Sequence, residues 1–177
     1  EAACGGAVGA DGAGLRLMDL MGRAGIDGSS VVVEKSKPTP LKTRCIAQSQ
    51  QMIRVDYEQT GPISKAAEAQ LVKRVSAAMK KAQLVLLSDY NKGVLTDRVL
   101  DGIMKAGKRL KRPVIVGPKG TSFEKYRGCT AIAPNLKELA LATGMSVATD
   151  DDIRAAAASL LDLLGCDFVL VTRGERG

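Results

Sequence analysis

The sequence predicts an α/β fold: a mostly parallel, twisted sheet with flanking helices in three layers, plus a small antiparallel β segment. Short runs of valine, leucine and isoleucine alternate with longer segments whose apolar residues recur at helical spacing. The runs 84–87, 114–116 and 168–171 are continuously apolar, which is typical of strands in a parallel sheet, and we expect the strand at 84–87 to be buried on both faces. Residues 42–58 instead alternate polar and apolar side chains, as an antiparallel ribbon with one wet face does.

The order of the elements follows from these patterns and from the turn residues between them. The expected strands cover residues 2–9, 30–34, 42–49, 51–58, 84–87, 114–116, 130–134 and 168–171. The expected helices cover residues 11–23, 64–79, 96–110, 135–144 and 151–164. By length, 177 residues are expected to form one domain, with the antiparallel segment at about 31–58 as a lid.

Side chains at two helix starts have a structural explanation. Ser64 precedes an apolar helical pattern and is expected to be its N-cap. Asn135 is the natural N-cap of the next-to-last helix, and Glu138 follows three residues later, which is the spacing of a capping box. A capping box alone accounts for both residues without any function.

Polar residues directly follow the apolar run 84–87. Ser88, Asp89 and Lys92 therefore come just past the carboxyl end of a strand, where open α/β sheets bind ligands. One interpretation is a small-molecule site. The other is a capped loop in which Ser88 or Asp89 satisfies backbone donors and Lys92 lies in solvent.

The composition narrows the function classes. The chain has no histidine, which excludes Ser-His and Cys-His catalysis. The four cysteines lack metal-site spacing, so we expect buried free thiols and no metal bound by them. Only five aromatic residues and a dispersed net charge of +7 favour a phosphorylated metabolite over nucleic acid, which leaves an RNA-binding domain as a weak alternative. No apolar run reaches about 18 residues and no signal peptide is visible, so we expect a cytoplasmic protein with a core of small aliphatic side chains.

Six short stretches, in chain order from about residue 8 to 177, carry a family resemblance. They are Pro38-Thr39 with Lys42-Thr43-Arg44; Gln50-Gln51-x-Ile53-Arg54-x-Asp56; Ser88-Asp89-Tyr90-x-Lys92-Gly93; Pro118-Lys119-Gly120 with Phe123-x-x-Tyr126-Arg127-Gly128; Pro134-Asn135-x-x-Glu138; and Thr172-Arg173-x-Glu175-x-Gly177. Together they resemble the ribokinase-like (PfkB) carbohydrate kinases. Within that family they are similar to the kinases that phosphorylate D-glycero-D-manno-heptose 7-phosphate at C1 in lipopolysaccharide (ADP-heptose) biosynthesis, often as half of a bifunctional kinase/adenylyltransferase.

The resemblance implies an enzyme that uses ATP and Mg²⁺ to phosphorylate a sugar phosphate. It implies a substrate-binding set on and beside the lid: Lys42, Arg44, Arg54, Asp89 and Lys92. It implies a nucleotide-binding set with Glu138 acting indirectly on the metal: Lys119, Asn135, Glu138, Thr172 and Gly174. Alternatively, Arg54 pairs with Asp56 or Glu58 and Lys42 is solvated. Because lids of this fold often pair between subunits, residues 31–57 are also expected to form a homodimer contact.

Two departures from the family pattern bear on activity. The family's catalytic base belongs to a Gly-Ala-Gly-Asp motif, expected beyond Gly177, and an early Gly-Gly-x-x-Asn segment is absent, so the chain is expected to be a middle portion without kinase turnover of its own. Gly117 stands where the family has Asp before Pro-Lys-Gly. The open alternatives are another PfkB sugar kinase and an inactive module that binds nucleotide or sugar phosphate. A Gly-Ala-Gly-Asp motif downstream in the parent gene would favour the kinase.

Overall fold

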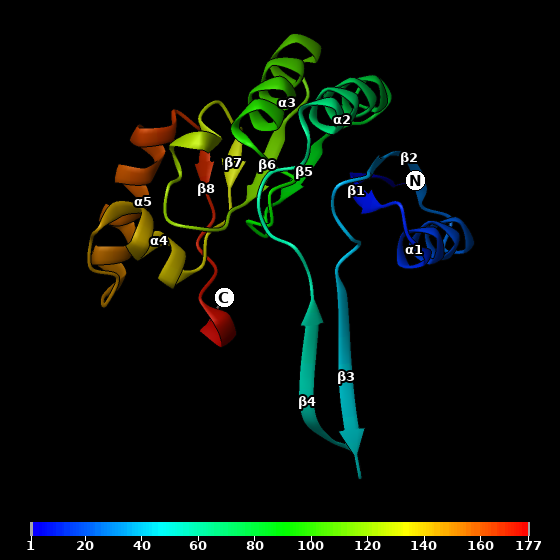
Figure 1. Ribbon diagram of the computed structural model, residues 1–177. Coiled ribbons are helices and arrows are strands. Elements are labelled where there is room, and N and C mark those ends of the chain that lie inside the picture. The colour runs from blue at the N-terminus through cyan, green and yellow to red at the C-terminus, as the bar shows by residue number, and fades with distance from the viewer. Residues whose placement is uncertain (1, 177) are drawn as a thin grey trace. The chain divides into compact units, whose positions relative to one another are not determined.

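The computed structural model describes residues 2–176 and forms two compact units. Unit 1 comprises Glu1–Ala78 and Lys92–Val99, and unit 2 comprises Met79–Asn91 and Leu100–Gly177. Within residues 2–176, no helix is long and apolar enough to cross a membrane. The α/β class expected from the sequence is confirmed, because the described residues form parallel sheets, five α-helices and one antiparallel pair of strands (Figure 1).

Unit 1 is built on a pair of parallel strands, β1 (Ala3–Gly9) and β2 (Asp27–Glu34). The crossover helix α1 (Gly12–Arg23) connects the strands, and α2 (Lys65–Ala78) packs against both of them. The side chain of Asp11 caps α1 by accepting a hydrogen bond from Gly14 N at 2.8 Å, and its other oxygen accepts from Thr39 N at 2.7 Å. The helix cap thereby also fixes the chain just before the lid.

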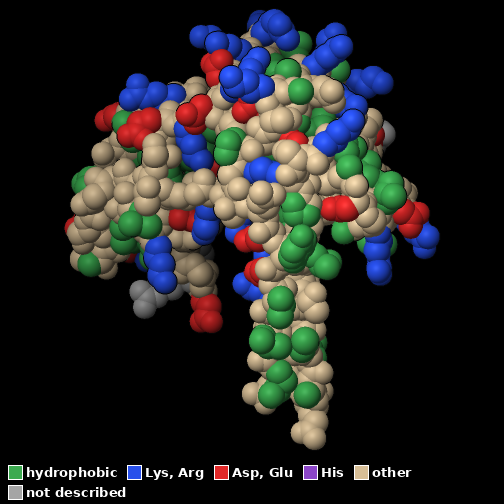
Figure 2. Space-filling view, in the orientation of Figure 1, with side chains coloured by type: hydrophobic (Ala, Val, Ile, Leu, Met, Phe, Trp, Pro, Cys, Tyr) green, Lys and Arg blue, Asp and Glu red, His purple; other side chains and the backbone are tan. Residues whose placement is uncertain are grey.

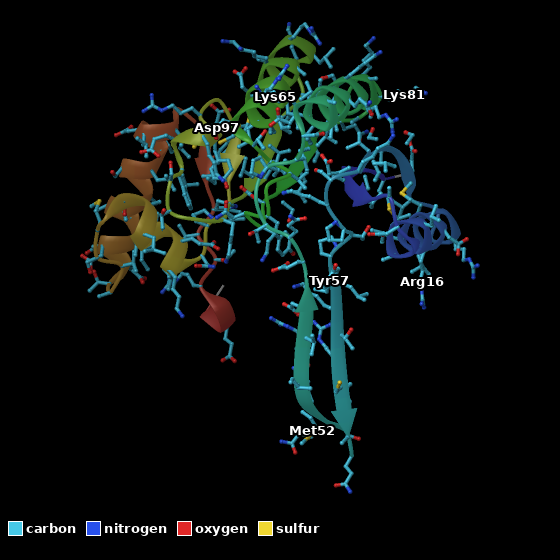
Figure 3. The ribbon with its side chains drawn as sticks, viewed as in Figure 1. Arg16, Met52, Tyr57, Lys65, Lys81 and Asp97 are labelled. Carbon is cyan, nitrogen blue, oxygen red and sulfur yellow. The ribbon has the colours of Figure 1, made fainter. Side chains whose placement is uncertain are left out.

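The lid is a two-stranded antiparallel hairpin of β3 (Leu41–Ala47) and β4 (Gln50–Tyr57). Gln48 and Ser49 form its turn with φ values of 49° and 67°, and two positive values are the signature of a tight hairpin turn that follows strand twist. Figure 3 places Met52 near the tip of the hairpin and Tyr57 at its base. The hairpin is shorter than the lid expected at 31–58, because residues 31–34 belong to β2.

The sheet of unit 2 has the order β5-β6-β7-β8, and all neighbours are parallel. Its strands are β5 (Val85–Ser88), β6 (Val114–Gly117), β7 (Ala131–Ile132) and β8 (Phe168–Val169). The accompanying helices are α3 (Asp97–Leu110), α4 (Leu136–Thr143) and α5 (Asp150–Leu164), with short 3₁₀ turns η1 (Glu124–Tyr126) and η2 (Gly174–Arg176). The core side chains come from alternate strand positions and from the inner faces of these helices; examples are Val116, Ile132, Leu100, Leu139 and Leu160.

Several expectations about burial need correction. The strand at 84–87 is not buried on both faces, because Leu87 is 5% exposed while Leu86 is 66% exposed. Successive strand residues point to opposite sides of the sheet, and in the described chain only the side carrying Leu87 is well covered. Two of the four thiols, Cys4 and Cys45, are exposed, because Cys4 lies in the exposed first part of β1 and Cys45 lies on β3, whose residues are all exposed.

The core is also not purely aliphatic. Phe123 and Tyr126 are almost completely buried at the short turn η1, with their rings 5.6 Å apart in a T-shaped contact. Strand β8 ends at Val169, two residues earlier than expected, because it pairs only with the two-residue strand β7. Helix α5 has a capping box of its own, formed by Thr149 and Asp152.

Candidate functional site

The loops that follow the four strands of unit 2 meet along one edge of its sheet. Asp89 N donates to Gly117 O at 2.9 Å, which joins the ends of β5 and β6. Thr172 N donates to Pro134 O at 2.9 Å, and Thr172 and Asn135 form a parallel bridge beyond β7 and β8. This edge is where parallel α/β sheets bind ligands, as the sequence suggested for Asp89.

Asp89 is a buried carboxylate whose oxygens are occupied by neighbours within unit 2. Oδ1 accepts a hydrogen bond from Asn91 N at 2.7 Å. Oδ2 accepts from Lys125 Nζ at 2.7 Å and from the Tyr126 hydroxyl at 2.6 Å. Burial by itself raises the pKa of Asp89, but these donors outweigh it and hold the pKa below its ordinary value, so the group is ionised at neutral pH.

Lys119 and Glu138 meet at the start of α4. Lys119 Nζ lies 3.1 Å from Glu138 Oε1. Glu138 Oε2 accepts from Asn135 N at 3.0 Å, and Asn135 Oδ1 accepts from Glu138 N at 2.9 Å. The capping box expected from the sequence is therefore confirmed. The Lys119 side chain is 55% exposed, so its ammonium is also open to a ligand.

Four of the five residues in the expected substrate-binding set belong to unit 1. The hairpin register pairs Lys42 with Asp56 and Arg44 with Arg54, so the three cations Lys42, Arg44 and Arg54 share one face. Asp89, the fifth residue, belongs to unit 2. Of the expected nucleotide-binding set, Lys119, Asn135, Glu138 and Thr172 lie along the sheet edge of unit 2, and Gly174 begins η2 with φ of 63°. Gly177 lies outside the described residues.

Carboxylates on the hairpin pair with these cations. Lys42 Nζ lies 2.8 Å from Asp56 Oδ2, and Arg54 Nε lies 3.0 Å from Asp56 Oδ1. Glu58 pairs with Lys92 and, at 3.8 Å, with Lys42. The hydrogen bond from Lys42 is the main reason that the pKa of Asp56 is lowered, and the one from Lys92 does the same for Glu58. The alternative in which Arg54 pairs with Asp56 describes this geometry, although Lys42 is paired and not simply solvated.

Such exposed pairs contribute little to stability, typically about 0–1 kcal/mol each, so an incoming dianion can compete for the cations. Arg44 is exposed and makes no ion pair with any residue in 2–176. The hairpin therefore carries one unpaired guanidinium beside two cations that are shared with carboxylates.

Sequence reasoning missed the role of the turn η1. Lys125 was not singled out, and Tyr126 appeared only as part of a family motif. The available signal was the spacing of Phe123 and Tyr126, since a Phe-x-x-Tyr pair is conspicuous in a chain with five aromatic residues.

At Gly117 an added Cβ would meet only Leu87 O, at 3.7 Å, so packing does not require glycine there. Within residues 2–176, no three acidic, cysteine or histidine side chains cluster closely enough to hold a metal ion by themselves.

The fold has clear relatives among solved structures. Ribokinase from Arabidopsis thaliana, complexed with ribose and ATP, matches 99% of this chain and 56% of its own with a TM-score of 0.70 at 22% identity. Phosphofructokinase-2 from Escherichia coli, in complex with potassium, matches 97% of this chain and 55% of its own with a TM-score of 0.73 at 18% identity. These similarities establish a ribokinase-like fold.

Curated proteins extend the comparison to sequence. The bifunctional protein HldE of Paramagnetospirillum magneticum is 41% identical over 170 residues, which are 96% of this chain and 35% of that protein. HldE of Azorhizobium caulinodans is 45% identical over 173 residues, 97% of this chain and 36% of that protein. The chain thus spans about a third of the length of these relatives. The family model described as pfkB family carbohydrate kinase matches residues 1–177, and the chain belongs to that family.

Proposed function

We propose that this chain provides part of an ATP-dependent kinase that phosphorylates D-glycero-D-manno-heptose 7-phosphate at C1, in the cytoplasm, for lipopolysaccharide core heptose synthesis. The observation that carries the proposal is the block from Gln50 to Asp56 together with Ser88 to Gly93, which resembles the heptose kinases. The identity of 41–45% to bifunctional HldE proteins along almost the whole chain supports it. The nearest alternative is that the chain belongs to another PfkB sugar kinase. The second alternative is an inactive binding module, which is favoured by Gly117 in place of the family's Asp.

The nucleotide would bind along the sheet edge of unit 2. Lys119 supplies an exposed ammonium, and the bridge between Asn135 and Thr172 brings the loops after β7 and β8 together. Mg²⁺ is commonly held by one or two carboxylates plus substrate phosphates and water, so the single carboxylate of Glu138 fits an indirect role. Bound Mg²⁺ would neutralise phosphate charge, and Lys119 would add a second cation while the sugar hydroxyl is positioned for transfer.

The sugar phosphate would bind to the cationic face of the hairpin. Arg44 is available directly, while Arg54 and Lys42 would exchange Asp56 for the phosphate dianion. A guanidinium can hold phosphate through two parallel hydrogen bonds, which an ammonium cannot copy. This gives the hairpin a role in selecting a sugar that already carries a phosphate.

The direct test is a coupled assay for ADP with the complete protein, ATP, Mg²⁺ and a panel of sugars. Turnover with heptose 7-phosphate well above that with heptose, fructose 6-phosphate or ribose is the expected result. Preference for another sugar would support the nearest alternative. Binding of ATP without turnover on any sugar would support the inactive module.

The substitution Arg54→Lys in the complete protein should raise the KM for the sugar phosphate about 10-fold or more, because one of the charge-assisted hydrogen bonds is lost. The KM for ATP should change much less, since no expected nucleotide-binding residue is altered. Arg16→Lys on α1, labelled in Figure 3, makes the same chemical change at an exposed site outside the hairpin and serves as the control. Equal effects on both KM values, or none, would place the phosphate site elsewhere.

We also propose that the apolar face of the hairpin forms a homodimer contact. Register places Leu41 beside Tyr57 and Cys45 beside Ile53, on the face opposite the cations, and Figure 2 shows hydrophobic side chains along the hairpin. Leu41, Ile53, Val55 and Tyr57 are each 52–67% exposed, and such a patch commonly marks a protein interface. Val31 and Val32 are buried within unit 1, so the contact would be narrower than the expected 31–57.

The double substitution Ile53→Lys and Val55→Lys should convert the dimer to a monomer, because two ammonium groups would have to be buried at the contact. Light scattering at several concentrations measures the mass. Leu15→Lys, at a leucine of α1 that is 76% exposed, adds the same charge away from the hairpin and should leave the mass unchanged. An unchanged mass in the double variant contradicts the contact.

A further inference from the structure

Two loops of unit 2, one of them containing the turn η1, meet at one hydroxyl group. The Tyr126 side chain is completely buried, and its oxygen lies 2.6 Å from Asp89 Oδ2. The same oxygen lies 3.2 Å from Lys119 N and 3.2 Å from Lys119 O. The loop after β5, the loop after β6 and the turn η1 therefore share this single polar contact.

The direction of the hydrogen bonds follows from the charges. Asp89 is ionised and accepts only, so the Tyr126 hydroxyl gives its one proton to Asp89 and accepts a hydrogen bond from Lys119 N. Burial, followed by the hydrogen bond to Asp89, raises the pKa of Tyr126, so the proton stays on the phenol throughout the working pH range. Lys125 Nζ, 2.7 Å from Asp89 Oδ2 and 4.9 Å from the Tyr126 ring centre, balances the buried charge.

This contact holds the main chain of a residue whose side chain belongs to the expected nucleotide site. Lys119 lies in the loop after β6, outside any strand, and its amide is fixed by the Tyr126 hydroxyl. Its ammonium reaches Glu138 at the start of α4. The flexible stem of a lysine lets its ammonium sample many positions. Holding the Lys119 amide in place and pairing the ammonium with Glu138 narrows that range.

We propose that Tyr126, anchored by Asp89, is a positioning residue that sets Lys119 for the nucleotide phosphates; this rests on the proposed function. Asp89 then acts on the nucleotide side through Tyr126, and it is not a ligand of the sugar. Anchoring Tyr126 and binding the sugar require different states of the Asp89 carboxylate. A sugar ligand needs free oxygens, whereas the Asp89 side chain is 4% exposed and already accepts three hydrogen bonds.

The test compares Tyr126→Phe with Tyr90→Phe in the complete protein. Tyr90 is 73% exposed in the loop after β5, so its substitution removes a hydroxyl of the same kind without touching the contact. Tyr126→Phe should raise the KM for ATP about 10-fold, because displacement of a positioning group by a fraction of an ångström is costly. The KM for the sugar phosphate should stay within about 2-fold, and the Lys119 amide should exchange its hydrogen faster, since it loses its acceptor.

Asp89→Asn is the second variant and separates the two roles of Asp89. Under the proposal it repeats the Tyr126→Phe pattern, with the KM for ATP raised and that for the sugar phosphate nearly unchanged. A selective rise in the KM for the sugar phosphate would make Asp89 a substrate ligand and overturn the proposal. So would an equal rise in both KM values, or unchanged exchange at Lys119 in Tyr126→Phe. Absence of turnover in the unaltered protein would instead overturn the proposed function, and the positioning role with it.

Discussion

Replacing Gly93 with alanine should destabilise unit 1 by about 3 kcal/mol or more. Gly93 has φ of 89°, a conformation that side chains disfavour, and a Cβ built there would lie 1.6 Å from Gly61 O and 2.2 Å from Gly61 C. Both neighbours are backbone atoms, so no side-chain rotation can relieve the overlap. The loop would have to move, and the hydrogen bond from Ile63 N to Gly93 O, at 2.9 Å, would be lost with it.

Gly128→Ala separates the overlap from the backbone conformation. Gly128 has φ of 85°, almost the same as Gly93, but an added Cβ meets nothing within 4 Å. Gly128→Ala should therefore lower the free energy of unfolding only by the cost of holding alanine in a left-handed conformation, about 1–2 kcal/mol. The free energy of unfolding in urea measures both variants. If the two cost the same, the approach of residues 61–63 to Gly93 does not constrain the fold.

The sequence specified those parts of the fold that depend on local patterns. Apolar runs located most of the strands. Side chains that can accept a hydrogen bond from the first helical turn located helix starts, as at Ser64 and Asn135. The alternation in 42–58 also predicted that Lys42, Arg44 and Arg54 share a face, because a strand offers only two sides. It did not predict the shift in register between Cys45 and Ile46. These features are decided within a few residues of each other, so one sequence suffices to find them.

The candidate site was less predictable because its contacts join distant residues. The hydrogen bond between Asp89 and Tyr126 spans 37 positions, and that between Lys119 and Glu138 spans 19. Spacing alone left Asp89 as either part of a ligand site or the cap of its loop. The hydrogen bond from Asn91 N fits the cap, and only the packing of η1 shows that Lys125 and Tyr126 also donate to Asp89. Exposure of Leu86 was equally hidden, since a continuous apolar run does not say how many layers cover the strand.

Acid should weaken unit 1 chiefly through Glu34, a buried carboxylate at the end of β2. Oε1 accepts from Ser36 N at 2.9 Å and from Ser36 Oγ at 2.7 Å, and Oε2 accepts from Ser64 N at 2.6 Å. These hydrogen bonds, with that from Ser36 N the strongest influence, lower the pKa of Glu34 from 4.5 to about 2. Because the folded pKa is depressed, its stabilisation is complete above about pH 4.5 and is lost as the pH falls toward 2, up to about 3 kcal/mol.

Glu34→Gln tests this assignment through the pH dependence of the free energy of unfolding. The variant should be less stable by about 1–3 kcal/mol at neutral pH. Glutamine keeps only one side-chain oxygen, so its NH₂ group would face the N–H of Ser64 or Ser36, and that N–H would lose its acceptor. The difference in free energy of unfolding between the two proteins should narrow from pH 5 to pH 2, since only the unaltered protein has a carboxylate at position 34 that becomes protonated. Asp162→Asn removes one negative charge from an exposed position of α5 and controls for charge alone. A gap that stays constant down to pH 2 would show that Glu34 is not the group whose protonation weakens the junction of β2 and α2.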